Sequence, residues 1–166
     1  IAFNAAYADN RSELSVTGER SAFDGYFSKI IDLDGSQIVY NAIWHKFSDS
    51  IRLLLENKYI FQAFWSHNNQ VPGHADWEKR FSKSKNLIKI ALRNQNTKLI
   101  LTTLFDRLYV LRNQLIHGGS TWNSSVNRDQ VRDGFQIMAF LVPLFIDLMM
   151  NYPEIPWGAP YYPVVD

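Results

Sequence analysis

The sequence predicts an all-α protein, a bundle of about five helices with an up-and-down core.

 Two observations predict this fold class. Hydrophobic residues recur at helical spacing in every long apolar segment, and the alternating pattern of a half-buried strand is lacking. The length of 166 residues, with 46% of them hydrophobic, suits one domain with a single core. We expect an arm at residues 1–20, a helical domain at 21–151 and a tail at 152–166 packed on the bundle.

The composition excludes some kinds of chemistry and leaves others open. The net charge of +1 neither indicates nor excludes binding to nucleic acid, so an RNA site has to come from local clusters of charge. The absence of cysteine excludes disulfides, thiolate catalysis and cysteine-based zinc sites, and it fits a reducing compartment. We therefore expect a cytoplasmic protein. The sequence begins with Ile1 rather than Met, so we expect it to be part of a longer or processed chain.

The first part of the chain is predicted to form three helices. The first covers residues 21–31 and the second residues 36–47, with a turn over residues 32–35 between them. The third runs from Asp49 towards Trp65, with Ser48 as its N-terminal cap. This third segment is rich in aromatic residues at helical spacing, which usually fill a core and less often stack on bases.

A polar loop is predicted at residues 66–74, where Pro72 and Gly73 give the clearest turn signal in the chain. Two of the four histidines lie in this loop. A metal site built from histidines would need a compact spacing or an HExxH pattern, and neither is present. We therefore expect ordinary loop histidines, with no metal and no other cofactor. The four histidines are His45, His67, His74 and His117.

The next helix is predicted at residues 76–93 and has a basic outer surface. Lys85, Lys89 and Arg93 recur every four residues and so form a row along one side. Two interpretations remain open for this row. It is either a solvated helix face or a track for RNA phosphates that leads towards the following helix.

Residues 97–119 form the most regular amphipathic helix in the sequence, ended by Gly118 and Gly119. One side is predicted to be core and carries a stripe of five leucines. These are Leu101, Leu104, Leu108, Leu111 and Leu115. A second face gathers polar groups around an aromatic ring. Its members are Asp106, Tyr109, Arg112, Asn113, Ile116 and His117.

The last helix is predicted at residues 128–151 and is strongly apolar. A membrane span needs about 20 uninterrupted apolar residues, and Gln136, Pro143 and Asp147 interrupt this run. We expect the buried central helix of the bundle, kinked near Pro143, and no association with a membrane. The tail that follows is expected to lie across the bundle. Its contacts are predicted at Trp157, Tyr161 and Tyr162.

The segment from Arg112 to His117, RNQLIH, resembles the Arg-x(4 to 6)-His signature of the HEPN superfamily, and most closely its Apea-like families. The likeness extends from about Leu99 to Val142. It implies an all-helical HEPN-like bundle, and it implies a metal-independent endoribonuclease of the kind found in toxin–antitoxin, abortive-infection and phage-defence systems. The family's two functional positions correspond to Arg112 and His117, with Asn113 as an accessory.

These residue types suit cleavage of RNA by its own 2′-hydroxyl. An imidazole such as that of His117 transfers protons near neutral pH, and the guanidinium of Arg112 offers a fork of donors to phosphate. One motif supplies too few groups for both proton transfers. In the HEPN family two protomers commonly pair around one cleft, so we expect a homodimer with Tyr109 and Ile116 in its interface. The same resemblance implies an antitoxin or another protein as a partner.

A structural role for the motif remains an alternative. Arg112 could pair with Asp106, and His117 could serve only to stabilise the end of its helix. The chain would then be a non-catalytic HEPN-like module that binds RNA or a protein partner. An Arg112 guanidinium tied to an internal carboxylate would favour this alternative, whereas a basic two-sided cleft would favour catalysis.

Overall fold

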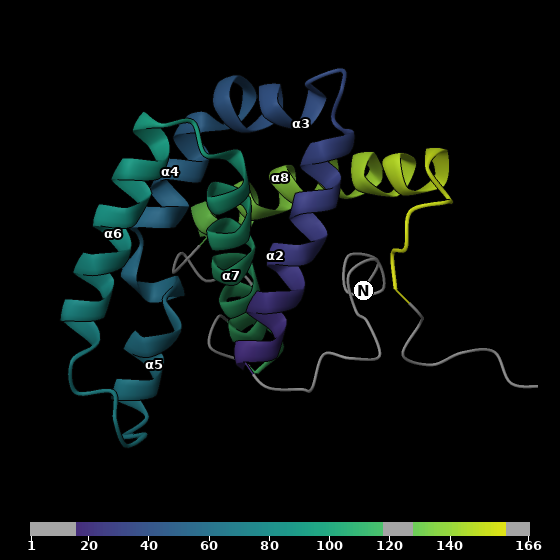
Figure 1. Ribbon diagram of the computed structural model, residues 1–166. Coiled ribbons are helices and arrows are strands. Elements are labelled where there is room, and N and C mark those ends of the chain that lie inside the picture. The colour runs from purple at the N-terminus through teal and green to yellow at the C-terminus, as the bar shows by residue number, and fades with distance from the viewer. Residues whose placement is uncertain (1–15, 118–127, 159–166) are drawn as a thin grey trace, which may run out of the picture.

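The computed structural model describes residues 16–117 and 128–158, with side chains described from residue 23 onward (Figure 1). All regular secondary structure in these residues is helical, which confirms the all-α class. The α-helices are α2 (Val16–Leu33), α3 (Ile38–Asn41), α4 (Ser48–Glu56), α5 (Gln62–Asn68), α6 (Trp77–Arg93), α7 (Thr97–Ile116) and α8 (Arg128–Asn151). A π-helical turn, η1 (Ala42–Lys46), and a 3₁₀ turn, η2 (Lys58–Ile60), lie between them.

The turn between α2 and α3 is stabilised by the carboxylate of Asp34. Its oxygens accept hydrogen bonds from the backbone N–H groups of Ile38, Val39 and Tyr40, at 2.8, 3.2 and 2.9 Å. These donors belong to the first turn of α3 and have no partner within the helix. The predicted second helix is therefore real, but it divides into α3 and η1.

The third predicted helix is divided into three elements, α4, η2 and α5. Asn57 interrupts it, because its backbone is extended and its side chain accepts a hydrogen bond from the N–H of Tyr59 at 2.8 Å. The predicted cap is also wrong. Ser48 lies inside α4, and Phe47 occupies the cap position without a side-chain hydrogen bond.

The helix α7 forms the centre of the described fold, with α2 and α6 on either side of it in Figure 1. It also contacts α4 and η2. Because neighbours surround it, α7 is buried on nearly all sides over its first four turns. The buried side chains are Ile100, Leu101, Thr102, Thr103, Leu104, Phe105, Arg107, Leu108, Val110, Leu111 and Gln114.

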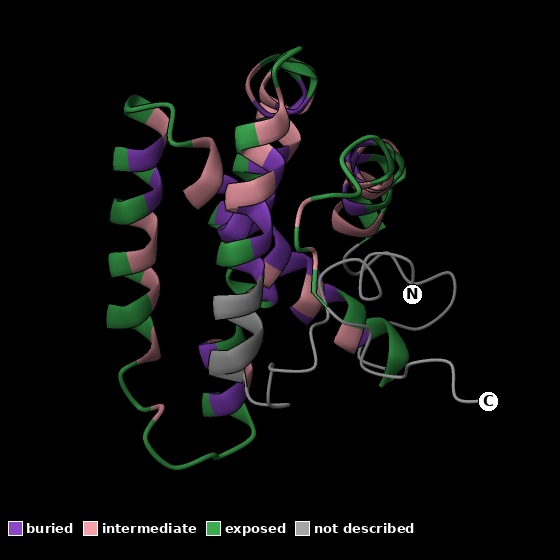
Figure 2. Cartoon of the chain, turned by 45° about the vertical axis from the view of Figure 1, so that its right-hand side comes forward, coloured by how far each residue is buried: buried purple, intermediate pink, exposed green. Residues whose placement is uncertain are grey.

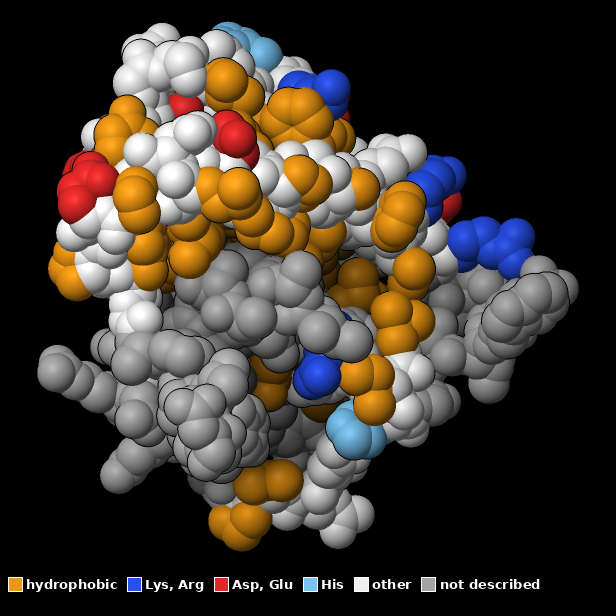
Figure 3. All heavy atoms as spheres, turned by 90° about the vertical axis from the view of Figure 1, so that its right-hand side faces the viewer, with side chains coloured by type: hydrophobic (Ala, Val, Ile, Leu, Met, Phe, Trp, Pro, Cys, Tyr) orange, Lys and Arg blue, Asp and Glu red, His pale blue; other side chains and the backbone are white. Residues whose placement is uncertain are grey.

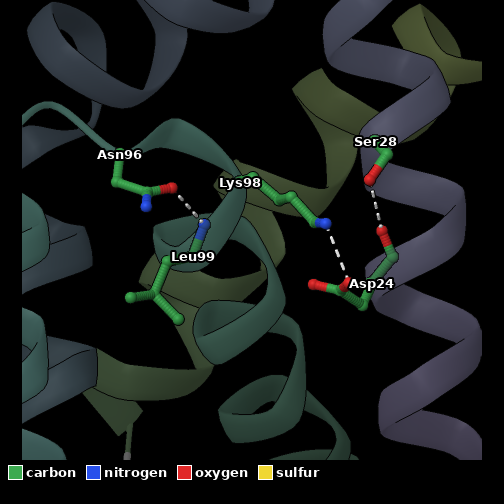
Figure 4. A network of polar contacts seen from close by, with 5 residues as sticks. All are labelled: Asp24, Ser28, Asn96, Lys98 and Leu99. Atoms are coloured by element: carbon green, nitrogen blue, oxygen red, sulfur yellow. Dashed lines mark hydrogen bonds and ion pairs between the residues drawn. The ribbon is translucent and has the colours of Figure 1, made fainter.

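The start of α7 is fixed by polar contacts (Figure 4). The side chain of Asn96 accepts a hydrogen bond from the N–H of Leu99 at 3.0 Å, as an N-terminal cap does. Lys98 forms an ion pair of 2.8 Å with Asp24 of α2. The indole N–H of Trp44 donates to the hydroxyl of Thr97 at 2.9 Å and ties η1 to the same place.

One residue of the leucine stripe departs from the prediction. Leu101 and Leu104 are fully buried, but Leu115 is 45% exposed. The reason is that α8 does not close over the last turn of α7, where a groove separates the two helices.

The helix α8 is not the buried central helix that the sequence predicts. Only one row of its residues is buried, consisting of Gly134, Ile137, Leu141, Phe145 and Leu148. Phe135 and Met150 on other faces are 70% and 73% exposed. By length and composition alone α8 could cross a membrane, but core helices of soluble proteins pass the same test. The place of a central helix is taken by α7.

The predicted helix at residues 76–93 is confirmed as α6. Ile88 and Ala91 are buried against its neighbours, and its outer side is exposed (Figure 2).

The segment after α8 packs against α2, as predicted for Trp157. Its ring lies 6.1 Å from that of Tyr26, and the ammonium of Lys29 donates to the carbonyl of Pro156. The predicted contacts of Tyr161 and Tyr162 lie outside the described residues.

Candidate functional site

The motif residues lie at the exposed end of α7. Arg112 and His117 are exposed and Asn113 is half-buried. The backbone N–H of His117 donates to the carbonyl of Asn113 at 2.9 Å and completes the last turn of the helix. The buried turns before it hold this end in place, so a well-packed helix carries the candidate site. The glycines predicted to end the helix, Gly118 and Gly119, lie outside the described residues.

Arg112 contacts two neighbours on its own helix. Its Nη1 donates to the side-chain oxygen of Asn113 at 3.1 Å, and its guanidinium carbon lies 6.0 Å from the centre of the Tyr109 ring. Within residues 16–117 and 128–158 no carboxylate forms an ion pair with Arg112, Asp106 included. A guanidinium has five N–H donors, so most of those on Arg112 remain available to an anion.

The side chain of Asn113 is hydrogen-bonded to Arg112 and not to the imidazole of His117 among the described contacts. Its oxygen accepts the hydrogen bond from the guanidinium. No hydrogen bond between the Asn113 side chain and the His117 ring is present among the described contacts. His117 is the C-terminal cap residue of α7.

A groove lies between α7 and α8 beside Arg112, with a volume of about 560 Å³. We call it the α7–α8 groove. Its apolar walls include Leu108, Leu111 and Leu115 of α7 and Val131, Phe135 and Met138 of α8. Tyr109 and Arg112 supply the polar groups among the side chains that line it. Figure 3 shows hydrophobic side chains gathered over the upper part of the face that lies on the right of Figure 1.

Gly134 sets how closely the two helices approach at this groove. A Cβ atom at that position would lie 2.9 Å from Cδ2 of Leu108 and 3.4 Å from Cδ2 of Leu111. The groove could not be predicted from the sequence, because it depends on which faces of two helices distant in the sequence meet. A glycine inside an apolar helix is a signal of close packing.

The two residues predicted for a dimer interface differ in exposure. Tyr109 is half-buried and lines the groove, whereas Ile116 is 59% exposed. An exposed isoleucine beside the motif fits an interface, and the homodimer stays a prediction.

The predicted RNA-binding row lies on α6, and none of its residues lines the groove beside Arg112. Lys89 and Arg93 are exposed, and the half-buried Lys85 has its ammonium 5.7 Å from the ring of Phe81. The short turn between α6 and α7 makes the two helices antiparallel, so Arg93 lies beside the start of α7. The motif is at the other end of this helix, about 30 Å long.

A buried arginine, Arg107, was not predicted from the sequence. Arg107 is 3% exposed, and its guanidinium carbon lies 4.3 Å from the centre of the Phe61 ring and 5.7 Å from that of Phe81. It also donates to the hydroxyl of Ser84 at 3.1 Å. Its position in the sequence indicated burial, because Arg107 lies three residues after Leu104 and so borders the buried stripe of leucines.

The other histidines lie apart from the motif. His45 is on η1, His67 on α5 and His74 in the following loop. Among the residues that the structure describes, no three histidine, aspartate, glutamate or cysteine side chains gather as a metal site would require.

Comparison with models of known protein families, with curated proteins and with solved structures gave no match for this chain.

Proposed function

We propose that this chain is a metal-independent endoribonuclease of the HEPN type. The observation that carries the proposal is the exposure of Arg112 and His117 at the end of α7, where Arg112 has no carboxylate partner in the described part of the chain. A guanidinium held in this way can receive a phosphate. An exposed imidazole on the next turn can transfer protons to and from the substrate.

The proposed reaction is an internal transfer of the RNA phosphate. His117 accepts the proton of the ribose 2′-hydroxyl as the 2′-oxygen attacks phosphorus. The bond from phosphorus to the 5′-oxygen breaks, and a second imidazole gives that oxygen a proton. Arg112 stabilises the charge that develops on the phosphate oxygens, and Asn113 holds the guanidinium in position. The products are a 2′,3′-cyclic phosphate and a 5′-hydroxyl.

A two-fold homodimer would supply the second imidazole. Ile116 and Tyr109 lie beside the motif, and burial of the exposed Ile116 by a partner copy would bring two motifs together. We expect sedimentation equilibrium to give a dimer, and Ile116→Glu to shift it towards monomer, because a charge would then be buried in the interface. A wild-type chain that sediments as a monomer at micromolar concentration would contradict this prediction.

The proposed setting is the cytoplasm, in a toxin or phage-defence role with an antitoxin or another protein as partner. The row formed by Lys85, Lys89 and Arg93 would bind RNA phosphates at a distance from the cut. The second candidate function is a HEPN-like module that binds RNA or a protein without cutting. The observation that favours it is the apolar α7–α8 groove beside the motif.

Incubation of the purified protein with mixed RNA in EDTA tests whether it cleaves RNA without a metal ion. We expect RNA to be cut to 2′,3′-cyclic phosphate ends while DNA survives. His117→Ala and Arg112→Gln should each lower the rate, by about 10² to 10⁴ for loss of the general base. The matched controls are His67→Ala and Arg52→Gln, which change exposed residues on α5 and α4 and should cut as the wild type does.

Circular dichroism shows whether each variant remains folded. Equal cutting by the wild type and both motif variants would rule out the proposed site. Loss of cutting on addition of EDTA would rule out the metal-independent mechanism. Binding of RNA without cutting would leave the second candidate function.

A further inference from the structure

The α7–α8 groove has the composition of a ligand site. Its volume is about 560 Å³, within the range of small-molecule sites in proteins. Apolar side chains form its walls, and part of that surface is exposed, since Phe135 is 70% and Leu115 45% exposed. An apolar ligand would remove these side chains from water.

Charge selects the kind of ligand. Arg112 lines the groove, is exposed, and has no carboxylate partner among the described residues. Among the described residues its one hydrogen bond is from Nη1 to Asn113, so other guanidinium donors can bind a carboxylate. The described side chains that line the groove therefore combine one positive charge and the hydroxyl of Tyr109 with apolar groups.

We propose that the α7–α8 groove binds a single-chain carboxylate amphiphile, such as a free medium- or long-chain fatty acid. Its carboxylate pairs with Arg112, and its chain lies between α7 and α8. An RNA base fits this lining less well, because base edges need several polar partners and the groove offers Tyr109 and Arg112. The proposal does not rest on ribonuclease activity, and its test contains no RNA.

Titration calorimetry with octanoate, decanoate and dodecanoate, each below the concentration at which it forms micelles, tests the contribution of the ligand's alkyl chain to binding. Affinity should rise about fourfold for each added methylene that becomes buried. Decanol tests the head group and should bind about tenfold more weakly than decanoate, because it lacks the charged hydrogen bond.

Two variants test the location. Arg112→Gln should remove the difference between decanoate and decanol, while Arg52→Gln on α4 should keep it. Ala139→Trp places a large ring at an exposed position that lines the groove and should abolish binding of both ligands. Circular dichroism and the thermal unfolding midpoint confirm that each variant is folded.

Three outcomes would overturn the proposal. The first is no binding of decanoate or dodecanoate by the wild type. The second is equal binding by the wild type and Ala139→Trp, which would mean adsorption elsewhere. The third is a dimer that Ala139→Trp dissociates while no amphiphile binds, which would assign the groove to a second copy of the chain.

Discussion

Arg107 is a charged residue whose side chain is buried between α7 and α6. Its guanidinium lies over the ring of Phe61 and donates to Ser84, so it joins α7 to α6 and to the residue before α5. A planar guanidinium can stack on a ring and donate sideways at once, whereas the ammonium of lysine is a compact charge. The identity of this residue should therefore affect stability.

We expect Arg107→Lys to lower the free energy of unfolding by about 1–2 kcal/mol, because the stacked contact is lost in a buried place. Urea denaturation followed by circular dichroism measures the change. Arg52→Lys replaces an exposed arginine on α4 and should change stability by less than about 0.5 kcal/mol. Equal effects of the two substitutions would show that the stacking contributes nothing specific.

At the scale of one helix, α7 is divided into a buried part and an exposed end. Leu104 is fully buried, whereas Leu115 is 45% exposed on the same helix. We expect Leu104→Ala to cost about 2–5 kcal/mol, from lost burial and the cavity that remains. Leu115→Ala should cost less than about 1 kcal/mol, since much of its side chain is already in water. Urea denaturation of the two variants in parallel makes the comparison.

A cost at Leu115 as large as that at Leu104 would mean that another surface covers the end of α7. A dimer could do so, and the dependence of stability on protein concentration would reveal it.

Helical periodicity predicted α6 and α7 well, because each has neighbours that bury a regular pattern of residues. It failed for α8, since an apolar composition does not tell how many faces of a helix are covered. It failed again between α4 and α5, where the local hydrogen bond of Asn57 competes with the helix. The position of Arg112 and His117 at the end of α7 was predictable from the sequence, but the contact of Arg112 with Asn113 and the groove beside it depend on side-chain packing.

At the scale of the whole molecule, α2, α7 and α8 meet through aromatic rings. The ring of Phe27 lies 4.9 Å from that of Phe105 and 5.8 Å from that of Phe145. Tyr26 is 5% exposed beside them, and Trp157 covers it from the returning chain. Burial raises the pKa of the Tyr26 hydroxyl well above its ordinary value of 10.0.

The raised pKa of Tyr26 predicts that the free energy of unfolding falls at alkaline pH. Below pH 10.0, Tyr26 is protonated in both the folded and the unfolded chain. Above it the unfolded chain loses the proton and the folded chain keeps it, so the free energy of unfolding should fall by about 1.4 kcal/mol per pH unit from this residue. Tyr26→Phe removes the titrating group. Urea denaturation between about pH 8 and 11, on both sides of the ordinary tyrosine pKa, should therefore show a shallower decline in the free energy of unfolding of the variant.

Parallel declines in the wild type and Tyr26→Phe would show that this hydroxyl reaches water in the folded protein.

The division of α7 also bears on how this protein can change over generations. Substitutions in its first four turns act on the buried core, so most of them lower stability and are open to selection against unfolding. The exposed end, with Arg112 and His117, meets few such constraints. A descendant could lose or exchange these two residues while it kept the fold, and an active chain and an inactive relative could then share one scaffold. Stability alone would not distinguish them.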